Sequence, residues 1–215
     1  LKQKLPCVHL VESAGVDLPN YSVKLWSKFG SVFYKKAKLS AAGIPVIAIL
    51  HGFSTAGGAY QIGMSDYVIG VKGNGMAALA GSALLRAATG ENATNSDIGG
   101  VEMHSVVTGS VEYLVNDDAE SIVTVRQLID QLNWNENDAQ KTTLNFEEPE
   151  YPIEDLAGIV PTDYSKGYDV REVIARLVDQ SVFIELKPKY GISMVCAQAK
   201  IEGIQCGIIA NNGPI

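Results

Sequence analysis

The chain has 215 residues, of which 47% are hydrophobic and 19% charged, and its formal net charge is −7. This composition excludes a chain that is disordered over most of its length. The acidic balance, with no cluster of five or more Lys and Arg residues, argues against nucleic-acid binding. Residues 1–72 hold eight lysines and three acidic residues, a net charge of +5, so residues 73–215 carry −12. The basic first third could attract a phosphorylated ligand, although solvated lysines on a helix face would give the same pattern.

The first 50 residues predict a βαβ unit. Leu5 to Glu12 is a short apolar strand, Val23 to Ala42 has helical spacing, and Val46 to Leu50 is a β-prone run expected to be covered on both faces. A strand, a helix and a strand in about 45 residues are typical of this unit. One helix face is predicted to be apolar, with Leu25, Trp26, Phe29, Phe33 and Ala37, and the lysines are expected elsewhere on the helix, at Lys24, Lys28, Lys35, Lys36 and Lys38.

The later segments predict further strands and helices in alternation. The predicted strands are Tyr67–Val71, Phe183–Leu186, Met194–Ile201 and Ile204–Ala210, the last two joined by a hairpin at Glu202-Gly203. The predicted helices are Ala78–Ala88, Asp117–Leu132 and Asp169–Val178, with Asp169 as a candidate N-cap. The polar stretch 133–152 is typical of a linker.

The uncharged stretch 39–65 does not predict a membrane span. Pro45 and five glycines interrupt it, and its apolar run from Ile44 to Leu50 is far shorter than the roughly 20 residues that a membrane helix needs. We therefore expect no membrane partner.

Cysteine and histidine usage predicts neither a disulfide framework nor a metal site. The chain has an odd number of cysteines without CxxC spacing, at Cys7, Cys196 and Cys206. Its histidines lack HxxxH or HxH spacing, at His9, His51 and His104. Reduced thiols favour the cytoplasm or the mitochondrial matrix as the compartment.

The strongest chemical signal is a small-residue turn, Ser54 to Gly58, directly after the buried strand. Glycine has no Cβ, so Gly57 and Gly58 would let a ligand approach the backbone. If a helix starts at Ala56 or Gly57, its free N–H groups could form an oxyanion hole for a thioester carbonyl that becomes an enolate. A tight strand-to-helix crossing would also require small residues, so spacing alone leaves both interpretations open.

A serine nucleophile is a weaker alternative. Gly52 to Ala56 is one residue off the nucleophile-elbow pattern, and His104 with Asp117 or Asp118 could complete a triad with Ser54. Asp117-Asp118 is also the expected start of a helix, and a serine beside a helix start is commonly a cap.

The order and spacing of several motifs resemble the carboxyltransferase (β) subunit of biotin-dependent acyl-CoA carboxylases, over nearly the whole chain. The matching blocks are Gly43–Leu50, Ser54–Tyr60, Met64–Asp66, Leu79–Gly81, Ala87–Glu91, Gly99–His104, Tyr113–Leu114, Gly158–Pro161, Tyr168–Arg176 and Ile208–Gly213. The Thr55–Tyr60 block and the ending Ala210–Gly213 are most similar to the methylcrotonyl-CoA and geranyl-CoA branch. Asn74–Ala78 and Ser82 depart from that branch, which keeps propionyl-CoA and acetyl-CoA carboxylases as alternatives.

The resemblance implies an α/β, crotonase-like fold with layered β-sheets and helices, within a two-domain carboxyltransferase. Residues 1–145 would be the later part of the N-terminal, CoA-binding domain, 146–165 a linker, and 166–215 the beginning of the C-terminal, biotin-facing domain. We expect the chain to be an internal piece of a longer polypeptide. The family commonly forms a hexameric core of β subunits and associates with an α subunit that holds biotin carboxylase and the biotin carrier.

The resemblance also implies a mechanism without a catalytic side-chain base. Carboxybiotin would supply CO₂ to an acyl-CoA thioester through an enolate, while ATP and bicarbonate are used only by the partner biotin carboxylase. Gly57 and Gly58 would hold the thioester oxygen. The substrate-binding positions would be Thr55, Ala56, Ala59, Tyr60 and Gly81.

Two other classes of function remain open at this point. A single-domain enoyl-CoA hydratase or isomerase shares the crotonase-like fold, and it would need a carboxylate poised over the acyl chain. A non-catalytic piece could bind CoA or occupy a place in an assembly without turnover.

Overall fold

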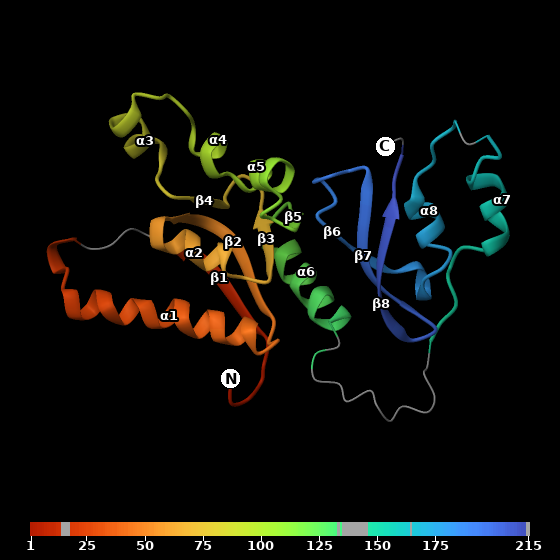
Figure 1. The fold of residues 1–215 in the computed structure, drawn as a ribbon, viewed down its shortest axis with the longest axis horizontal. Helices are drawn as coiled ribbons and strands as arrows, with labels where there is room; N and C mark the ends of the chain where they lie inside the picture. The colour runs from red at the N-terminus through yellow and green to blue at the C-terminus, as the bar shows by residue number, and fades with distance from the viewer. Residues whose placement is uncertain (14–17, 133, 135–145, 164, 214–215) are drawn as a thin grey trace. The chain divides into compact units, whose positions relative to one another are not determined.

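The chain forms two compact units, Leu1–Gln127 and Leu128–Ile215, each with its own β-sheet. The computed structural model describes residues 1–13, 18–132, 134, 146–163 and 165–213, and Figure 1 shows their elements in chain order. The predicted linker and domain boundaries at 145 and 165 stay predictions.

Unit 1 is built on a parallel sheet. Its strands lie in the order β1 (Cys7–Ser13), β2 (Val46–Thr55), β3 (Tyr67–Val71) and β5 (Tyr113–Val115), while β4 (Met76–Ala78) pairs with the end of β2. The first five residues of β2 are fully buried, because neighbouring strands and both faces of the sheet enclose them. The predicted βαβ unit is therefore confirmed.

The strand β2 continues five residues beyond its predicted end at Leu50. Residues Phe53 to Thr55 pair in parallel with Met76 to Ala78, a short strand that the sequence analysis assigned partly to a helix. The helix after it begins at Ser82 and not at Ala78, so the predicted helix start was wrong. Pairing with a neighbouring strand outweighs the helical propensity of the alanines here.

The helices of unit 1 are mostly short. They are α1 (Val23–Ala41), α2 (Ala59–Gly63), α3 (Ser82–Thr89), α4 (Asn95–Gly99), α5 (Val101–Met103) and the start of α6 (Asp118–Gln131). α1 begins at the N-cap Ser22, whose hydroxyl accepts a hydrogen bond from the Leu25 N–H at 3.2 Å. It ends just before Gly43, whose φ of +70° turns the chain into β2. α6 starts beside Asp117, which accepts the Glu120 N–H, as a helix start predicts.

The predicted faces of α1 are only partly observed. Leu25, Trp26 and Phe29 were expected to pack inward, yet each is about half exposed, and Trp26 and Phe29 contact each other in a tilted ring pair. Lys36 was expected on a polar face, and it is buried. Lys36 lies three residues after the half-buried Phe33 on the same side of the helix, so a lysine forms part of the inward face.

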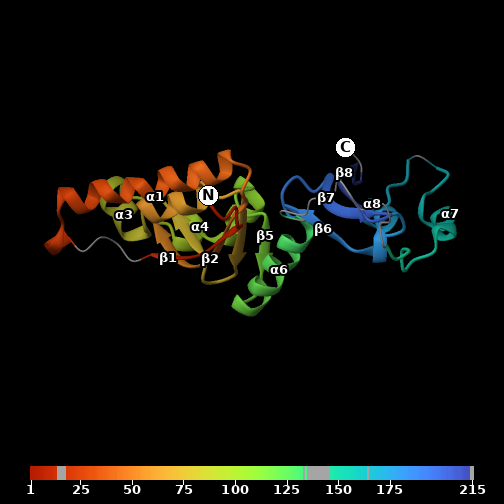
Figure 2. The same cartoon turned by 90° about the horizontal axis from the view of Figure 1, so that it is seen from below.

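Unit 2 is a small antiparallel sheet covered by a helix. The strands β6 (Phe183–Leu186), β7 (Met194–Ile201) and β8 (Ile204–Asn211) lie in that order, as predicted. The hairpin between β7 and β8 turns at Glu202 and Gly203, whose φ angles are both positive, as a type I′ turn requires. Figure 2 shows these strands beside α8 (Val170–Ile174). Two short helical segments, Ile153–Asp155 and α7 (Leu156–Ile159), precede it.

α8 closes the core of unit 2. Its residues Val170 and Ile174, together with Val178, pack against Val195 and Ala199 of β7. Asp169 caps the helix as predicted, accepting the Arg171 N–H at 3.0 Å. The helix was predicted to run to Val178 and ends at Ile174, so its predicted length was wrong.

No helix in the described ranges combines the length and apolar character needed to cross a membrane.

An ion pair joins α8 to the sheet and gives the first prediction. Arg171 donates from Nε and Nη2 to the two carboxylate oxygens of Glu185 at 2.6 Å each, and these bonds raise the pKa of the guanidinium. Because Glu185 is only 13% exposed, Arg171→Lys should lower the free energy of unfolding by about 1–3 kcal/mol, since an ammonium cannot make both bonds. Calorimetric melting of the full-length protein measures this. Arg86→Lys, an exposed position on α3, serves as the control, and equal midpoints for the two variants would contradict the prediction.

Candidate functional site

The turn after β2 combines a strained residue with two glycines. β2 ends at Thr55, Ala56 to Gly58 form a 3-10 turn, and α2 follows at once (Figure 1). Ala56 has φ of +51°, a left-handed conformation that costs a residue with a Cβ about 1–2 kcal/mol. Strain of this kind persists only where the surroundings enforce it, and it is concentrated at functional sites.

Gly58 is seated directly on two serine hydroxyls. Ser13 of β1 and Ser54 of β2 are partners in the strand register, and their Oγ atoms lie 3.3 Å apart. A Cβ added to Gly58 would overlap with the Ser13 Oγ and lie 2.7 Å from the Ser54 Oγ. Ser54 is completely buried, so it has no room to move aside. A side chain at position 58 would therefore require the serine hydroxyls to shift.

Gly57 has the opposite surroundings. It is exposed, and a Cβ added there would meet nothing within 4 Å. The first N–H groups of a helical turn have no acceptor within the helix. The chain therefore presents open backbone at Gly57, beside a glycine whose position is fixed by packing.

A second loop leaves the neighbouring strand at the same edge of the sheet. Thr55 at the end of β2 pairs with Ala78 at the end of β4, so the segments that follow both strands start side by side. Gly81 lies three residues later as the N-cap of α3, and Asn95 Oδ1 accepts the Ser82 N–H at 2.8 Å beside it. The carboxyl ends of parallel strands are a common place for ligands in α/β proteins.

The other predicted binding residues have distinct roles in packing. Ala59 packs against the buried core cluster of unit 1, next to Ile62. The Tyr60 ring is 60% exposed and meets Phe33 of α1 edge to face, with the ring centroids 5.8 Å apart. Thr55 and Gly81 are half-buried.

The alternative serine triad is not assembled. The Ser54 hydroxyl is bonded to Ser13 and buried, while His104 binds the Ala77 carbonyl oxygen through Nε2 at 2.7 Å and Thr108 through Nδ1 at 3.0 Å. Asp118 lies 3.8 Å from His51 and not beside His104. The geometry therefore gives Ser54 a structural role beneath the glycine turn.

The remaining candidate ligands are dispersed. Within the described ranges, no three His, Cys, Asp or Glu residues gather in a way that could hold a metal ion. The three cysteines are free thiols, each half-buried.

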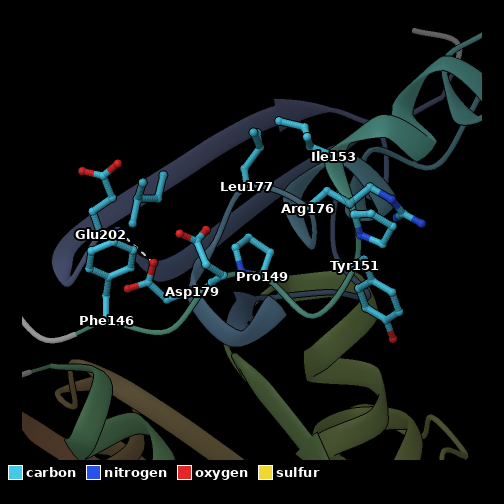
Figure 3. Close-up of a pocket in the computed structure, with 11 residues that line it drawn as sticks. Phe146, Pro149, Tyr151, Ile153, Arg176, Leu177, Asp179 and Glu202 are labelled. Carbon is cyan, nitrogen blue, oxygen red and sulfur yellow. Dashed lines mark hydrogen bonds between the residues drawn. The ribbon is translucent and has the colours of Figure 1, made fainter.

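Unit 2 contains a hollow of roughly 330 Å³, shown in Figure 3. Its charged lining is mainly acidic, with Glu148, Asp179 and Glu202, whereas Arg176 already pairs with Glu172 at 2.9 Å and Asp155 at 3.4 Å. The Asp179 oxygens accept the N–H groups of Glu202 and Gly203 at 2.8 Å each. Its acidic lining repels anions, so the hollow does not suit a phosphorylated ligand.

Sequence reasoning missed two supports of the turn. Ser13 lies 41 residues from Ser54, and only the register of β1 with β2 reveals their contact. Lys36 was grouped with the solvated lysines of its helix, yet its ammonium binds the Gln61 carbonyl oxygen in the last turn of α2.

Comparison with known proteins identifies the family. The model of the carboxyl transferase domain matches residues 1–214. The mitochondrial methylcrotonoyl-CoA carboxylase beta chain of Dictyostelium discoideum is 43% identical over 99% of this chain and 36% of its own length. A probable biotin-dependent acyl-coenzyme A carboxylase beta2 subunit of Mycobacterium tuberculosis is 42% identical over 98% of this chain and 39% of its own length.

Solved structures agree with the predicted fold. A transcarboxylase 12S structure, described as a hexamer assembly with hydrolyzed methylmalonyl-coenzyme A bound, superimposes with a TM-score of 0.85 at 31% identity. The match covers 98% of this chain and 40% of the transcarboxylase chain. The geranyl-CoA carboxylase beta subunit of P. aeruginosa is 43% identical over all of this chain and 40% of its own, with a TM-score of 0.56. The α/β, crotonase-like fold is confirmed. The chain spans about two fifths of the length of these relatives, and it belongs to the carboxyl transferase domain family.

Proposed function

We propose that this chain is part of the carboxyltransferase component of a biotin-dependent acyl-CoA carboxylase of the methylcrotonyl-CoA type. The longer protein would transfer CO₂ from carboxybiotin to an acyl-CoA. The observation that carries the proposal is the turn after β2. Gly58 is held there on the Ser13–Ser54 pair, while the backbone at Gly57 is open.

The backbone of this turn would stabilise negative charge on the thioester oxygen. When the acyl-CoA loses its acidic proton, charge moves onto that oxygen, and N–H donors at Gly57 and Gly58 would bind it more strongly than they bind the neutral carbonyl. Rigid support matters because donors that are already in place need no reorganisation during the reaction. Thr55, Ala56, Ala59, Tyr60 and Gly81 would line the acyl-CoA side of the site.

Biotin would enter as a group carried by a partner, and it supplies the CO₂ and the base for the substrate proton when it is bound. The part of the site formed by this chain would be the acyl-CoA side, and lysines of residues 1–72, which carry a net charge of +5, could attract the CoA phosphates. ATP and bicarbonate would act only at the partner biotin carboxylase.

The relatives support the proposed assembly and compartment. The transcarboxylase 12S structure is described as a hexamer and a multienzyme core, and several relatives are named as mitochondrial. We infer a homo-oligomeric, hexameric β core that binds an α subunit with biotin carboxylase and the biotin carrier. The compartment would be the cytoplasm or the mitochondrial matrix.

The reaction class can be tested with the full-length protein and its biotin-bearing partner. Incorporation of labelled bicarbonate is measured with 3-methylcrotonyl-, geranyl-, propionyl- and acetyl-CoA. Carboxylation of the first at the highest kcat/KM is expected, and preference for another acyl-CoA would revise the substrate. Hydration of a crotonyl thioester without biotin would replace the proposal by a hydratase. Acyl-CoA binding without turnover of any of them would replace it by a non-catalytic binding role.

Gly58→Ala should destabilise the folded protein. The added Cβ would collide with the Ser13 and Ser54 hydroxyls, so the free energy of unfolding should fall by about 1–3 kcal/mol. Gly57→Ala is the matched control, because its Cβ meets no neighbour within 4 Å, and its melting temperature should equal that of the wild type. Equal melting temperatures for both variants would show that the serine pair does not constrain Gly58.

Gly57→Ala should instead affect catalysis while the protein stays folded. A methyl group over the open backbone would hold the thioester oxygen away from the donors, so kcat/KM for carboxylation should fall at least about tenfold. Steady-state assays of the full-length enzyme measure this. Gly63→Ala, another open and exposed glycine at the far end of α2, is the control. Activity of Gly57→Ala at the wild-type level would remove Gly57 from the proposed site.

A further inference from the structure

Lys36 is the one buried lysine of α1. It is 5% exposed, whereas its neighbours Lys35 and Lys38 are exposed. Burial of an ammonium is costly unless hydrogen bonds replace its water. Desolvation lowers the pKa of Lys36, and nearby Cys7 and Asp66 partly oppose that shift. The desolvation cost of the Lys36 ammonium indicates that it has a structural or functional role.

The ammonium of Lys36 binds the end of α2. Its Nζ donates to the backbone carbonyl oxygen of Gln61 and to the Ser65 Oγ at 3.0 Å. The Ser65 hydroxyl donates to the same carbonyl oxygen at 2.8 Å. Gln61 lies in the last turn of α2 (Ala59–Gly63), where carbonyl groups lack partners within the helix and a positive charge is favourable.

Asp66 connects the chain after α2 to two other elements close to the Lys36 contact. Asp66, next to Ser65, accepts the Val46 N–H at 2.8 Å and the Ser40 hydroxyl at 2.5 Å. It thereby ties the chain after α2 to the start of β2 and to the end of α1. The Phe33–Tyr60 ring contact lies along the same two helices. α2 is therefore held at its carboxyl end by α1, while the Ser13–Ser54 pair holds Gly58 at its other end.

We propose that Lys36 is a positioning residue for the Ala56–Gly58 turn, acting through α2. With only five residues in α2, a movement at Gln61 is passed directly to Gly58 and Gly57. The proposal rests on the proposed function, in which those two residues bind the thioester oxygen. The Lys36 ammonium is bonded to Gln61 and Ser65 and not to the turn itself, so its effect would be to keep the donors in place as charge develops.

Lys36→Met tests this in the full-length enzyme with its biotin-bearing partner. Methionine keeps much of the length of the side chain and removes the ammonium. We expect kcat to fall about tenfold or more with KM for the acyl-CoA changed less than about twofold, because misplaced N–H donors would weaken binding of the charged oxygen in the transition state more than binding of the acyl-CoA. Amide hydrogen exchange should become faster at residues 57–63 and stay unchanged in β1 and β3. Lys35→Met removes the same charge from the exposed face and should match the wild type in kcat and exchange.

A second, milder variant tests the proposal if Lys36→Met does not fold. Ser65→Ala removes one of the two acceptors of Lys36 and keeps the bond to Gln61, so it should show the same changes at a smaller size, about two- to fivefold in kcat. Activity is expressed per folded enzyme. A loss in either variant that only follows the folded fraction would overturn the proposal. So would a raised KM with unchanged kcat, or exchange at residues 57–63 equal to that of Lys35→Met.

The exchange measurement also separates the two proposals. If the wild-type enzyme carboxylates no acyl-CoA, the proposed function fails, and the exchange at residues 57–63 alone decides whether Lys36 holds the turn. If the wild type is active and Lys36→Met behaves as Lys35→Met does, the proposed function stands and the role of Lys36 fails.

Discussion

The close packing of Gly58 on the Ser13–Ser54 pair is the constraint on which the geometry of the turn depends. The sheet sets the backbone positions of both serines, because β1 and β2 are parallel neighbours, and Ser54 has no exposed surface. The backbone at position 58 lies close to them, so this packing restricts how the chain leaves β2. Ala56 absorbs the change of direction in its left-handed conformation. The cost of that strain is offset by the packing around it.

A rigid turn suits chemistry that is carried out by the backbone. Side chains that act as acids or bases can be recognised by their pKa values and partners, whereas N–H donors act only through their position. The supports of such donors therefore become as important as the donors themselves. Ser13, Ser54 and Lys36 would have this supporting role around α2, and each of them comes from a different element. The negative charge that develops during the reaction would lie on the substrate and not on a protein side chain.

Local sequence patterns correctly predicted the elements in which the intrinsic propensity of the residues matches the structure that their tertiary contacts favour. The run Val46 to Leu50 is apolar and rich in β-branched residues, and it became a buried strand. The Glu202-Gly203 turn produced the expected hairpin. The short strand Met76–Ala78 was missed because three residues rich in alanine carry little β signal, and only pairing with Phe53–Thr55 stabilises it. The length of α8 was overestimated for a related reason, since its apolar spacing continues to Val178 although the helix ends at Ile174.

The glycine turn was visible in the sequence, and its supports were not. Gly57 and Gly58 stand out as a pair after a strand, but nothing in the pattern distinguishes the glycine that packs from the one that is open. That difference arises from Ser13, 41 residues from Ser54 and outside any motif around the turn. Lys36 illustrates a related limit, because its spacing of three from Phe33 and seven from Phe29 puts it on the apolar face of α1, but only the fold shows that the carbonyl end of α2 meets its ammonium there. A site made of backbone N–H groups can therefore be recognised in the sequence from the glycines that allow its conformation. The residues that hold it rigid can be recognised only from the tertiary structure.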